Sequence, residues 1–253
     1  RGPCGSRGQF RNDGVEVGNL EMTDMPNFYP ALPEIFLACS AMAFMMVGVF
    51  VNEKKALSVV HVLSLTSLII VGILLVSMRG KPMSGFNGQF VSDDFAIYMK
   101  LLVLLGSFVT LLMSQSYLKR ENMARFEYPV LVLFATVGMM MMVSANDLIA
   151  LYLGLELQSL SLYVLAAFKR DTTRSSEAGL KYFVLGALSS CMLLYGCSMI
   201  YGFTGTTAFD DLAKVFSGPE TASIGLIVGI VFLIAGLAFK VSAVPFHMWT
   251  PDV

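Results

Sequence analysis

The stretch "LIALYLGLELQSLSLYVLAAF", from Leu148 to Phe168, is almost wholly apolar, yet it carries Glu156 near its middle. A charged side chain at the centre of a lipid bilayer costs about 2.5–3.5 kcal/mol on insertion scales. Such a residue is a functional-site hypothesis by default, provided that the segment spans a membrane. Composition and the remaining apolar segments decide whether it does.

The composition is typical of a membrane protein. Of the 253 residues, 56% are hydrophobic and 14% are charged, whereas soluble domains carry about 25% charged residues. The net charge of −1 gives no basis for binding nucleic acid. The four cysteines have no metal-ligand or redox spacing, so neither a metal site nor a disulfide framework is expected. Because no glycine-rich phosphate loop, dinucleotide-binding fingerprint or haem-ligand pair is visible, we expect no cofactor in this chain.

Several apolar windows are long enough to cross a bilayer, which takes about 20 residues of helix. Backbone groups in lipid must be satisfied internally, so uniform apolar runs predict helices and exclude an alternating barrel. The sequence predicts an all-α, polytopic transmembrane bundle with about seven spans. Residues 1–30 would form a polar extension, 31–127 the first three helices and 128–253 the next four. The windows are 31–51, 57–78, 95–117, 128–146, 148–168, 178–203 and 223–246.

The connection between the last two windows contains "TTAFDDLAKVF". Its threonines suit a helix N-cap, acids follow in the first turn, and apolar residues recur on one side. This pattern predicts a short helix on the membrane surface.

Basic residues between the spans are unequally divided. One side has only Arg79, Lys81 and Lys214 besides the arginines of the remote tail. Since the basic side faces the cytoplasm or the mitochondrial matrix, the amino terminus is predicted to face out. The other side carries Lys54, Lys55, Lys119, Arg120, Arg125, Lys169, Arg170 and Arg174.

Seven helices in this orientation also describe a receptor. A receptor would carry signature motifs after its third span and near the end of its seventh. Here these segments read "QSYLKREN" and "KVSAVPFHMWTPDV". Neither fits, and no cysteine pair is placed to tie the outer loops together, so the receptor interpretation is rejected.

The surroundings of Glu156 on its helix are polar. Positions three, four and seven residues apart share a helix face, and on this face lie Tyr152, Ser159 and Tyr163. The carboxylate is therefore predicted to face protein or water and not lipid. A hydrogen-bonded, inert structural acid is the alternative interpretation.

A second charge, Lys240, lies in "LIAGLAFKVSAVPFHMW". Pro245 has no N–H to donate to the carbonyl of Val241, so the seventh helix is predicted to be interrupted. The freed carbonyls need water or a polar side chain as partners. A buried lysine near a carboxylate can exchange a proton near neutral pH, which an exposed lysine cannot. The alternative is a lysine whose ammonium reaches the inner surface.

Other polar residues near the spans are weaker candidates. Lys181, one turn inside the sixth window, is a proton relay or an interface anchor, and the sequence leaves both open. His247, beside the predicted break, is a relay candidate, whereas His61 is expected to be packed or capped. Lys100 and Asp147 are expected only to anchor their helices.

The sixth window also carries small residues at helical spacing. They are expected to let a neighbouring helix approach closely. These positions are Gly186, Ser189, Ser190 and Gly196.

Three long motifs together resemble a known family. "NDLIALYLGLELQSLSLYVLAAF", "SSEAGLKYFVLGALSSCMLLYGCSMIYGFTGTT" and "GLAFKVSAVPFHMWTPDV" are similar to the antiporter-like subunit N family of respiratory NADH:quinone oxidoreductase. Its mitochondrial members are NADH dehydrogenase subunit 2 of complex I. The resemblance runs from Leu32 to the end and covers the amino-terminal half of such a subunit.

The resemblance implies a proton-translocating membrane-arm subunit without a cofactor. It would belong to an H+-translocating NADH:ubiquinone reductase and carry out no redox chemistry itself. Its partners would be the other membrane-arm subunits and membrane lipids, without nucleic acid. In the family, a glutamate of the fifth helix pairs with a lysine of the interrupted seventh; these fall on Glu156 and Lys240. The family's sixth-helix lysine falls on Lys181.

Family members continue for about seven more helices, beginning with one that supplies a central lysine. We therefore expect a separate chain with the carboxyl-terminal half, docked on helices five to seven. The non-Met start favours an imported, trimmed precursor in the mitochondrial inner membrane, with a bacterial plasma membrane as the alternative. Rival functions are a subunit of a cation/proton antiporter or membrane-bound hydrogenase, or a purely structural scaffold.

Overall fold

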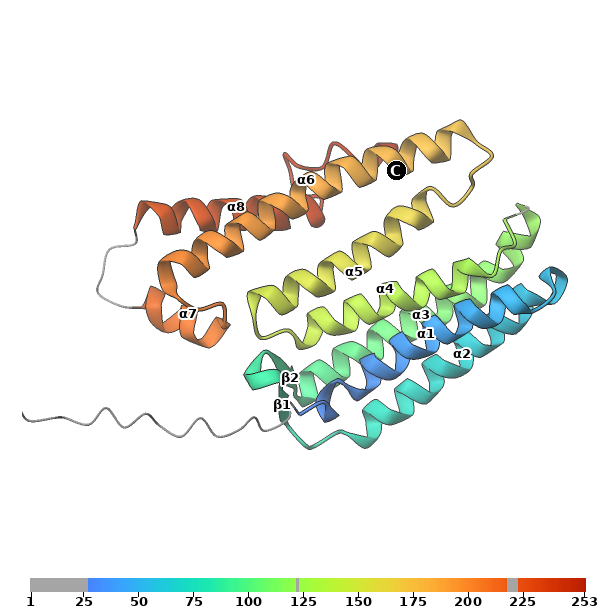
Figure 1. Cartoon of the computed structure of the whole chain (residues 1–253), viewed down its shortest axis with the longest axis horizontal. Coiled ribbons are helices and arrows are strands. Elements are labelled where there is room, and N and C mark those ends of the chain that lie inside the picture. Colours follow the sequence, from blue (N-terminus) through green and yellow to red (C-terminus); the bar gives the residue numbers. More distant parts are fainter. Residues whose placement is uncertain (1–26, 122, 218–222) are drawn as a thin grey trace, which may run out of the picture.

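A computed structural model describes residues 27–121, 123–217 and 223–253 (Figure 1). Most of the predicted polar extension, residues 1–26, lies outside the described residues. The described chain is mainly helical. Its helices are α1 (Leu32–Phe50), α2 (Glu53–Ser77), α3 (Asp94–Arg120), α4 (Glu127–Ser144), α5 (Leu148–Ala166), α6 (Thr173–Thr204), α7 (Phe209–Phe216) and α8 (Ile224–Lys240).

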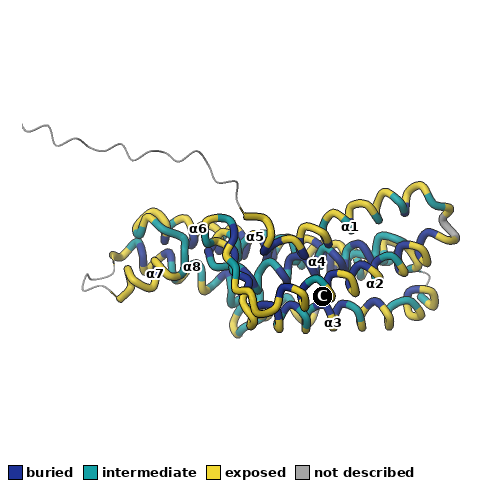
Figure 2. Tube along the Cα trace, turned by 90° about the horizontal axis from the view of Figure 1, so that it is seen from below, coloured by how far each residue is buried: buried dark blue, intermediate teal, exposed yellow. Residues whose placement is uncertain are grey.

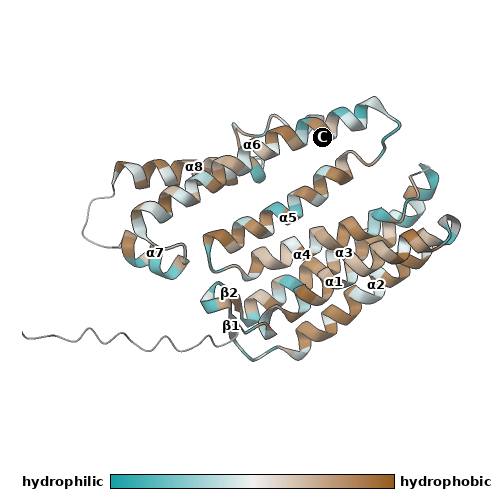
Figure 3. Cartoon of the chain, viewed as in Figure 1, coloured by the Kyte–Doolittle hydropathy of each residue, from teal (hydrophilic) through white to brown (hydrophobic). Residues whose placement is uncertain are grey.

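The predicted polytopic helical bundle is confirmed. Within the described residues, the first six long helices are long and apolar enough to cross a membrane, and α8 is a shorter apolar helix. Figure 3 shows the apolar colouring along these helices and polar residues at many of their ends. The two largest differences between the helix bounds and the predicted windows are in α6 and α8. Helix α6 already begins at Thr173, because its first turn is polar and the window counted only apolar residues. Helix α8 ends at Lys240 and does not continue to residue 246.

A small antiparallel hairpin between α2 and α3 was not predicted. Strands β1 (Met83–Gly85) and β2 (Phe90–Ser92) pair across a 3-10 turn. The turn contains Asn87 and Gly88, both with positive φ, which is the backbone that Asn-Gly pairs favour in hairpins. The side chain of Asn146 donates a hydrogen bond to the Gly88 carbonyl over 3.1 Å. The hairpin is thereby attached to the corner between α4 and α5.

The short helix predicted between the last two windows is α7. Its apolar side is buried through Leu212, which packs with Leu148, Ile200 and Leu226. Its outer side carries an ion pair between Lys214 and Asp211, with 2.8 Å between Nζ and Oδ1. This helix lies at the same end of the molecule as the hairpin (Figure 1).

The connections between α1 and α2, α3 and α4, and α5 and α6 lie together at the opposite end (Figure 1). These connections and the adjoining helix ends carry the basic residues counted above, from Lys54 to Arg174. The fold thus gathers the basic loops at one end of the bundle, as the orientation argument requires.

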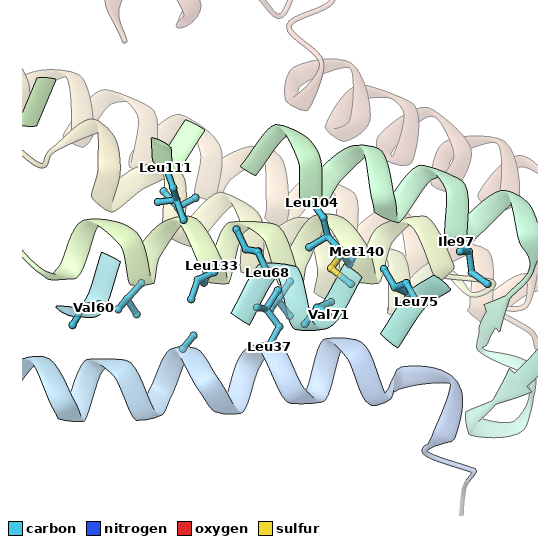
Figure 4. Packing of buried hydrophobic residues seen from close by; sticks show 14 of the residues in the cluster. Leu37, Val60, Leu68, Val71, Leu75, Ile97, Leu104, Leu111, Leu133 and Met140 are labelled. Atoms are coloured by element: carbon cyan, nitrogen blue, oxygen red, sulfur yellow. The ribbon is translucent and has the colours of Figure 1, made fainter. Parts of the chain in front are cut away.

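Helix α4 is the central helix of the amino-terminal bundle. More than half of its span, 56%, is buried, against 28–39% for the other candidate spans. Its apolar side chains interlock with those of α1, α2 and α3 (Figure 4). Ser107 and Thr136 form a buried hydrogen bond of 2.7 Å between α3 and α4.

The outer faces of the helices are exposed, whereas buried residues follow the helix contacts (Figure 2). Many of the exposed side chains are large and apolar, as in Phe50 and Ile224, which are 81% and 82% exposed. Continuous exposed apolar surface marks contact with lipid or with other membrane proteins.

Glycines permit the closest helix contacts. Between α4 and α5, a Cβ at Gly138 would lie 2.8 Å from the carbonyl oxygen of Gly154. Between α6 and α8, a Cβ at Gly196 would lie 2.6 Å from the amide nitrogen of Leu233. Backbones approach this closely only where side chains are small, and the close-packing role predicted for Gly196 is confirmed.

Replacing Gly196 with valine should force α6 and α8 apart. The expected loss is about 1–3 kcal/mol, as for overpacked cores, and it would appear as a lower thermal unfolding midpoint of the detergent-solubilised protein. Gly202→Val is the matched control, because it lies on the same helix and no heavy atom lies within 4 Å of its added Cβ. Equal midpoints for the two variants would contradict the close contact.

Candidate functional site

Helices α5 and α8 bring Glu156 and Lys240 together. The Lys240 Nζ lies 3.4 Å from a carboxylate oxygen of Glu156, and the two side chains are 11% and 21% exposed. The two residues are 84 positions apart in the chain, so only the fold makes them neighbours. The structure thus contains the ion pair that the family resemblance implied.

Hydroxyl groups complete the surroundings of this pair. Lys240 Nζ donates to Ser159 Oγ over 2.7 Å and to Tyr163 Oη over 3.3 Å. From α6, Ser190 donates a short hydrogen bond to Glu156. An ammonium has three N–H donors, and here three oxygens from α5 surround it. The charge is therefore satisfied by protein groups and does not need to reach the membrane surface.

The end of α8 fixes the position of Lys240. Lys240 is the last residue of the helix, and Ser242 takes a positive φ of 54°. The amide of Ala243 donates to the carbonyl of Ala238 over 2.8 Å, which is the hydrogen bond of a Schellman-type helix end. The predicted interruption is confirmed. The helix ends five residues before Pro245, at the turn that Ser242 and Ala243 form.

The segment after the break folds back over the site. Trp249 donates from its ring nitrogen to the Phe239 carbonyl over 3.3 Å. Its ring stacks on Tyr182, with 4.7 Å between centroids, and on Phe239. Tyr182 in turn packs edge-on against Tyr163. This aromatic column connects the broken end of α8 to the residue that holds the lysine.

Two of the predicted small residues of α6 lie against the site. A Cβ at Gly186 would collide with the hydroxyl of Tyr163, so glycine gives this tyrosine its room and the close-packing prediction holds there. Ser190 was predicted only as a packing position; its hydroxyl also binds Glu156. Sequence reasoning missed this role, although Ser190 lies one helical turn from Gly186.

The other two relay candidates have different surroundings. Lys181 pairs with Glu177 one turn earlier, with 2.8 Å between Nζ and Oε1, and its side chain is 43% exposed. His247 lies exposed in the non-helical segment after α8. Their roles as relays stay predictions.

Two polar residues near the spans are buried. His61 is 3% exposed, which confirms the packed histidine. Asp147, at the head of α5, is 2% exposed and caps this helix by accepting a hydrogen bond from the amide of Ile149 over 2.7 Å. Thr207 donates a second hydrogen bond to its carboxylate.

The expectation that Lys100 only anchors α3 is wrong. Lys100 is fully buried and forms an ion pair with Glu34 of α1, with 2.6 Å between Nζ and Oε1. The ring of Phe90, on strand β2, lies 4.8 Å from the ammonium. Because the unpredicted hairpin supplies this ring, the lysine is shielded near the end of its helix.

Glu34 was not singled out from the sequence. It is 4% exposed and lies near the start of the first apolar window, so the criterion applied to Glu156, a charge near the middle of a span, does not find it. Its second carboxylate oxygen has no hydrogen-bond partner among the described residues. Among the described residues, two ion pairs are largely buried, and of these two only the pair between α5 and α8 is surrounded by hydroxyl groups.

Two family profiles match consecutive parts of the chain. "NAD(P)H-quinone oxidoreductase subunit 2 N-terminal" matches residues 23–116, and "NADH:quinone oxidoreductase/Mrp antiporter, TM" matches residues 145–253. Over 228 residues the chain is 60% identical to NADH-quinone oxidoreductase subunit N of Rhodospirillum rubrum, covering 88% of this chain and 46% of that protein. The corresponding protein of Paramagnetospirillum magneticum is 58% identical over 230 residues, with 88% and 47% covered.

The chain belongs to the subunit N family of NADH-quinone oxidoreductases. A solved structure agrees: a chain of respiratory complex I from Thermus thermophilus with bound aureothin superposes with a TM-score of 0.71 at 32% identity, covering 87% of this chain and 46% of that one. The chain thus spans about half the length of the subunit N relatives it matches. Glu34 and Lys100 fall in the first matched region, and Glu156 and Lys240 in the second.

Removing one partner of the fully buried Glu34–Lys100 pair should destabilise the protein strongly. Lys100→Met leaves Glu34 buried without a counter-charge, and breaking a buried pair in this way costs about 3–5 kcal/mol. The double variant Glu34→Gln/Lys100→Met should recover most of this loss in detergent-phase thermal unfolding. Lys214→Met, which breaks an exposed pair, is the control, with an effect of about 0–1 kcal/mol. If Lys100→Met is no less stable than the control, Glu34 and Lys100 do not form a buried ion pair in the folded protein.

Proposed function

We propose that this chain acts as the amino-terminal half of a proton-translocating, membrane-arm subunit of NADH:quinone oxidoreductase. In this proposal Glu156 and Lys240 carry the proton relay. The observation that supports it best is an acid and an amine, from a continuous helix and a broken one, that meet 3.4 Å apart and only partly shielded. The subunit N relatives support the assignment to this enzyme.

The relay works through the mutual dependence of the two charges. While the pair is closed, both groups stay ionised because each stabilises the charge of the other. Moving the pair apart, or placing another charge beside it, leaves an ammonium in a low-dielectric site and favours release of its proton. Moving one charge against 100 mV costs about 2.3 kcal/mol. Removing one partner of a buried pair costs about 3–5 kcal/mol, so interactions of this kind are comparable in scale with the cost of that step.

Neighbouring hydroxyls give the proton somewhere to go. Ser159 and Tyr163 accept hydrogen bonds from Lys240, and Ser190 donates one to Glu156. A hydroxyl both donates and accepts, so each can pass a proton without becoming charged for long. Lys181 and His247 are proposed as further relay positions.

We propose that NADH oxidation and quinone reduction take place in other subunits and that this chain takes part in the enzyme without a cofactor. The other membrane-arm subunits and the remaining part of the relatives' length are its proposed partners. That remaining part would pack on α5, α6 and α8, where Val231 and Ile234 are 59% and 57% exposed. The relatives named above are bacterial, which favours a plasma membrane over the mitochondrial inner membrane expected from the sequence.

A cation/proton antiporter is the second candidate function, because the family profile on residues 145–253 also describes Mrp antiporters. Co-purification with NADH-oxidising, iron–sulfur subunits supports the oxidoreductase. Sodium/proton exchange without such subunits supports the antiporter.

Glu156→Gln should nearly abolish NADH-driven proton pumping in membrane vesicles that carry the assembled complex. Glutamine keeps the shape and can still accept the hydrogen bond from Ser190, so the effect isolates the lost charge. Asp211→Asn is the control, since that aspartate of α7 is 55% exposed and should leave pumping unchanged. NADH oxidation with an artificial electron acceptor should stay normal in both variants. Unimpaired pumping by Glu156→Gln would reject the relay and favour a structural scaffold.

A further inference from the structure

A cavity of about 560 Å³ opens at the basic end of the bundle, between α1, α4, α5 and α6. Its volume is in the range of small-molecule sites. Its mouth carries Arg125, Glu127 and Arg170, and its inner walls are apolar, with Leu131, Val164 and Phe183. Tyr163, which accepts a hydrogen bond from Lys240, also lines this cavity, but the charged groups at its mouth take no part in the proposed relay.

The charged groups at the mouth lack partners. Neither Arg125 nor Arg170 makes an ion pair within the part of the chain that the structure describes. The nearby Lys169, by contrast, is paired with Glu121, with 3.3 Å between Nζ and Oε2. One carboxylate oxygen of Glu127 is buried without a hydrogen-bond partner among the described residues. The mouth thus has a formal charge of +1, two free guanidinium groups and one free acceptor.

The depth of the cavity indicates an amphiphilic occupant. Phe183 lies ten residues along α6 from Thr173, which corresponds to about 15 Å at 1.5 Å per residue. The walls therefore run from the level of the lipid head groups into the hydrocarbon. Inorganic phosphate would bind the arginines but leave the apolar walls uncovered, whereas a phospholipid fills both parts.

We propose that this cavity binds one anionic phospholipid with a hydroxyl-bearing head group, of the phosphatidylglycerol type. Its phosphate lies between Arg125 and Arg170, because guanidinium groups bind phosphate oxygens in a two-pronged geometry. A glycerol hydroxyl donates to the free oxygen of Glu127, and an acyl chain follows Leu131, Val164 and Phe183. Basic pockets between helices on the cytoplasmic side favour anionic lipids in this way.

Charge distinguishes this lipid from a zwitterionic one. Phosphatidylethanolamine could place its ammonium on Glu127, but it carries no net charge and leaves the mouth at +1. Phosphatidylglycerol carries one negative charge, which neutralises the mouth, and its hydroxyls still satisfy Glu127. The two lipids therefore predict opposite outcomes in a competition.

The test measures the lipids that the purified, assembled complex retains after exchange into an equimolar mixture of phosphatidylglycerol, phosphatidylethanolamine and phosphatidylcholine. The double variant Arg125→Gln/Arg170→Gln should lose one tightly held phosphatidylglycerol per complex relative to wild type. Lys119→Gln/Arg120→Gln removes the same charge on the same side without touching the cavity, and it should keep that lipid. NADH oxidation with an artificial acceptor checks that both variants assemble.

Two single variants keep the proposal testable if the double variant does not assemble. Val164→Trp fills the apolar wall and should lose the lipid with both arginines intact. Glu127→Gln keeps an acceptor oxygen and removes the negative charge, so phosphatidylglycerol should stay bound. Equal loss in both double variants, full retention by Val164→Trp, or phosphatidylethanolamine as the lipid retained by wild type would each overturn the proposal.

Discussion

The ion pair between Glu156 and Lys240 is the interaction on which the site depends. An ammonium below the membrane surface is tolerable only if oxygens surround it, and the fold supplies them from one stripe of α5. Helix α8 ends where Lys240 meets this stripe. On α6, the missing side chain of Gly186 leaves room for the hydroxyl of Tyr163. The break in α8 is thus part of the site, because it fixes the position of the amine.

The second ion pair, between Glu34 and Lys100, differs from the first in its surroundings. Glu34 and Lys100 are 5% and 0% exposed at their side chains, and an aromatic ring covers the ammonium. The Glu156 and Lys240 side chains are 21% and 11% exposed and are surrounded by hydroxyl groups. The same two chemical groups therefore form a closed structural contact in one half of the chain. In the other half they form a contact that is partly exposed and surrounded by hydroxyl groups, which is why we propose it as the relay.

The spans could be predicted because lipid leaves a long apolar segment no alternative to a helix. The broken helix could be predicted because proline removes a backbone donor. The Glu34–Lys100 pair could not be, since it joins residues far apart in sequence. The hairpin, by contrast, is local, and its Asn87-Gly88 turn is a signal that the sequence analysis did not use. Lys100 looked like an anchor because it lies near the start of α3; only the covering hairpin makes its surroundings dry. Likewise, the role of Ser190 follows from the neighbour that α6 meets and not from its own spacing.

Infrared spectroscopy of the carboxyl groups in the Lys240→Met variant tests the central claim most directly. If the two charges depend on each other, losing the amine should leave Glu156 protonated at neutral pH. A carboxylic acid C=O band absent from wild type should then appear, and it should vanish in Lys240→Met/Glu156→Gln. If the carboxylate of Glu156 stays ionised without Lys240, and no such band appears, the two groups do not form a coupled pair.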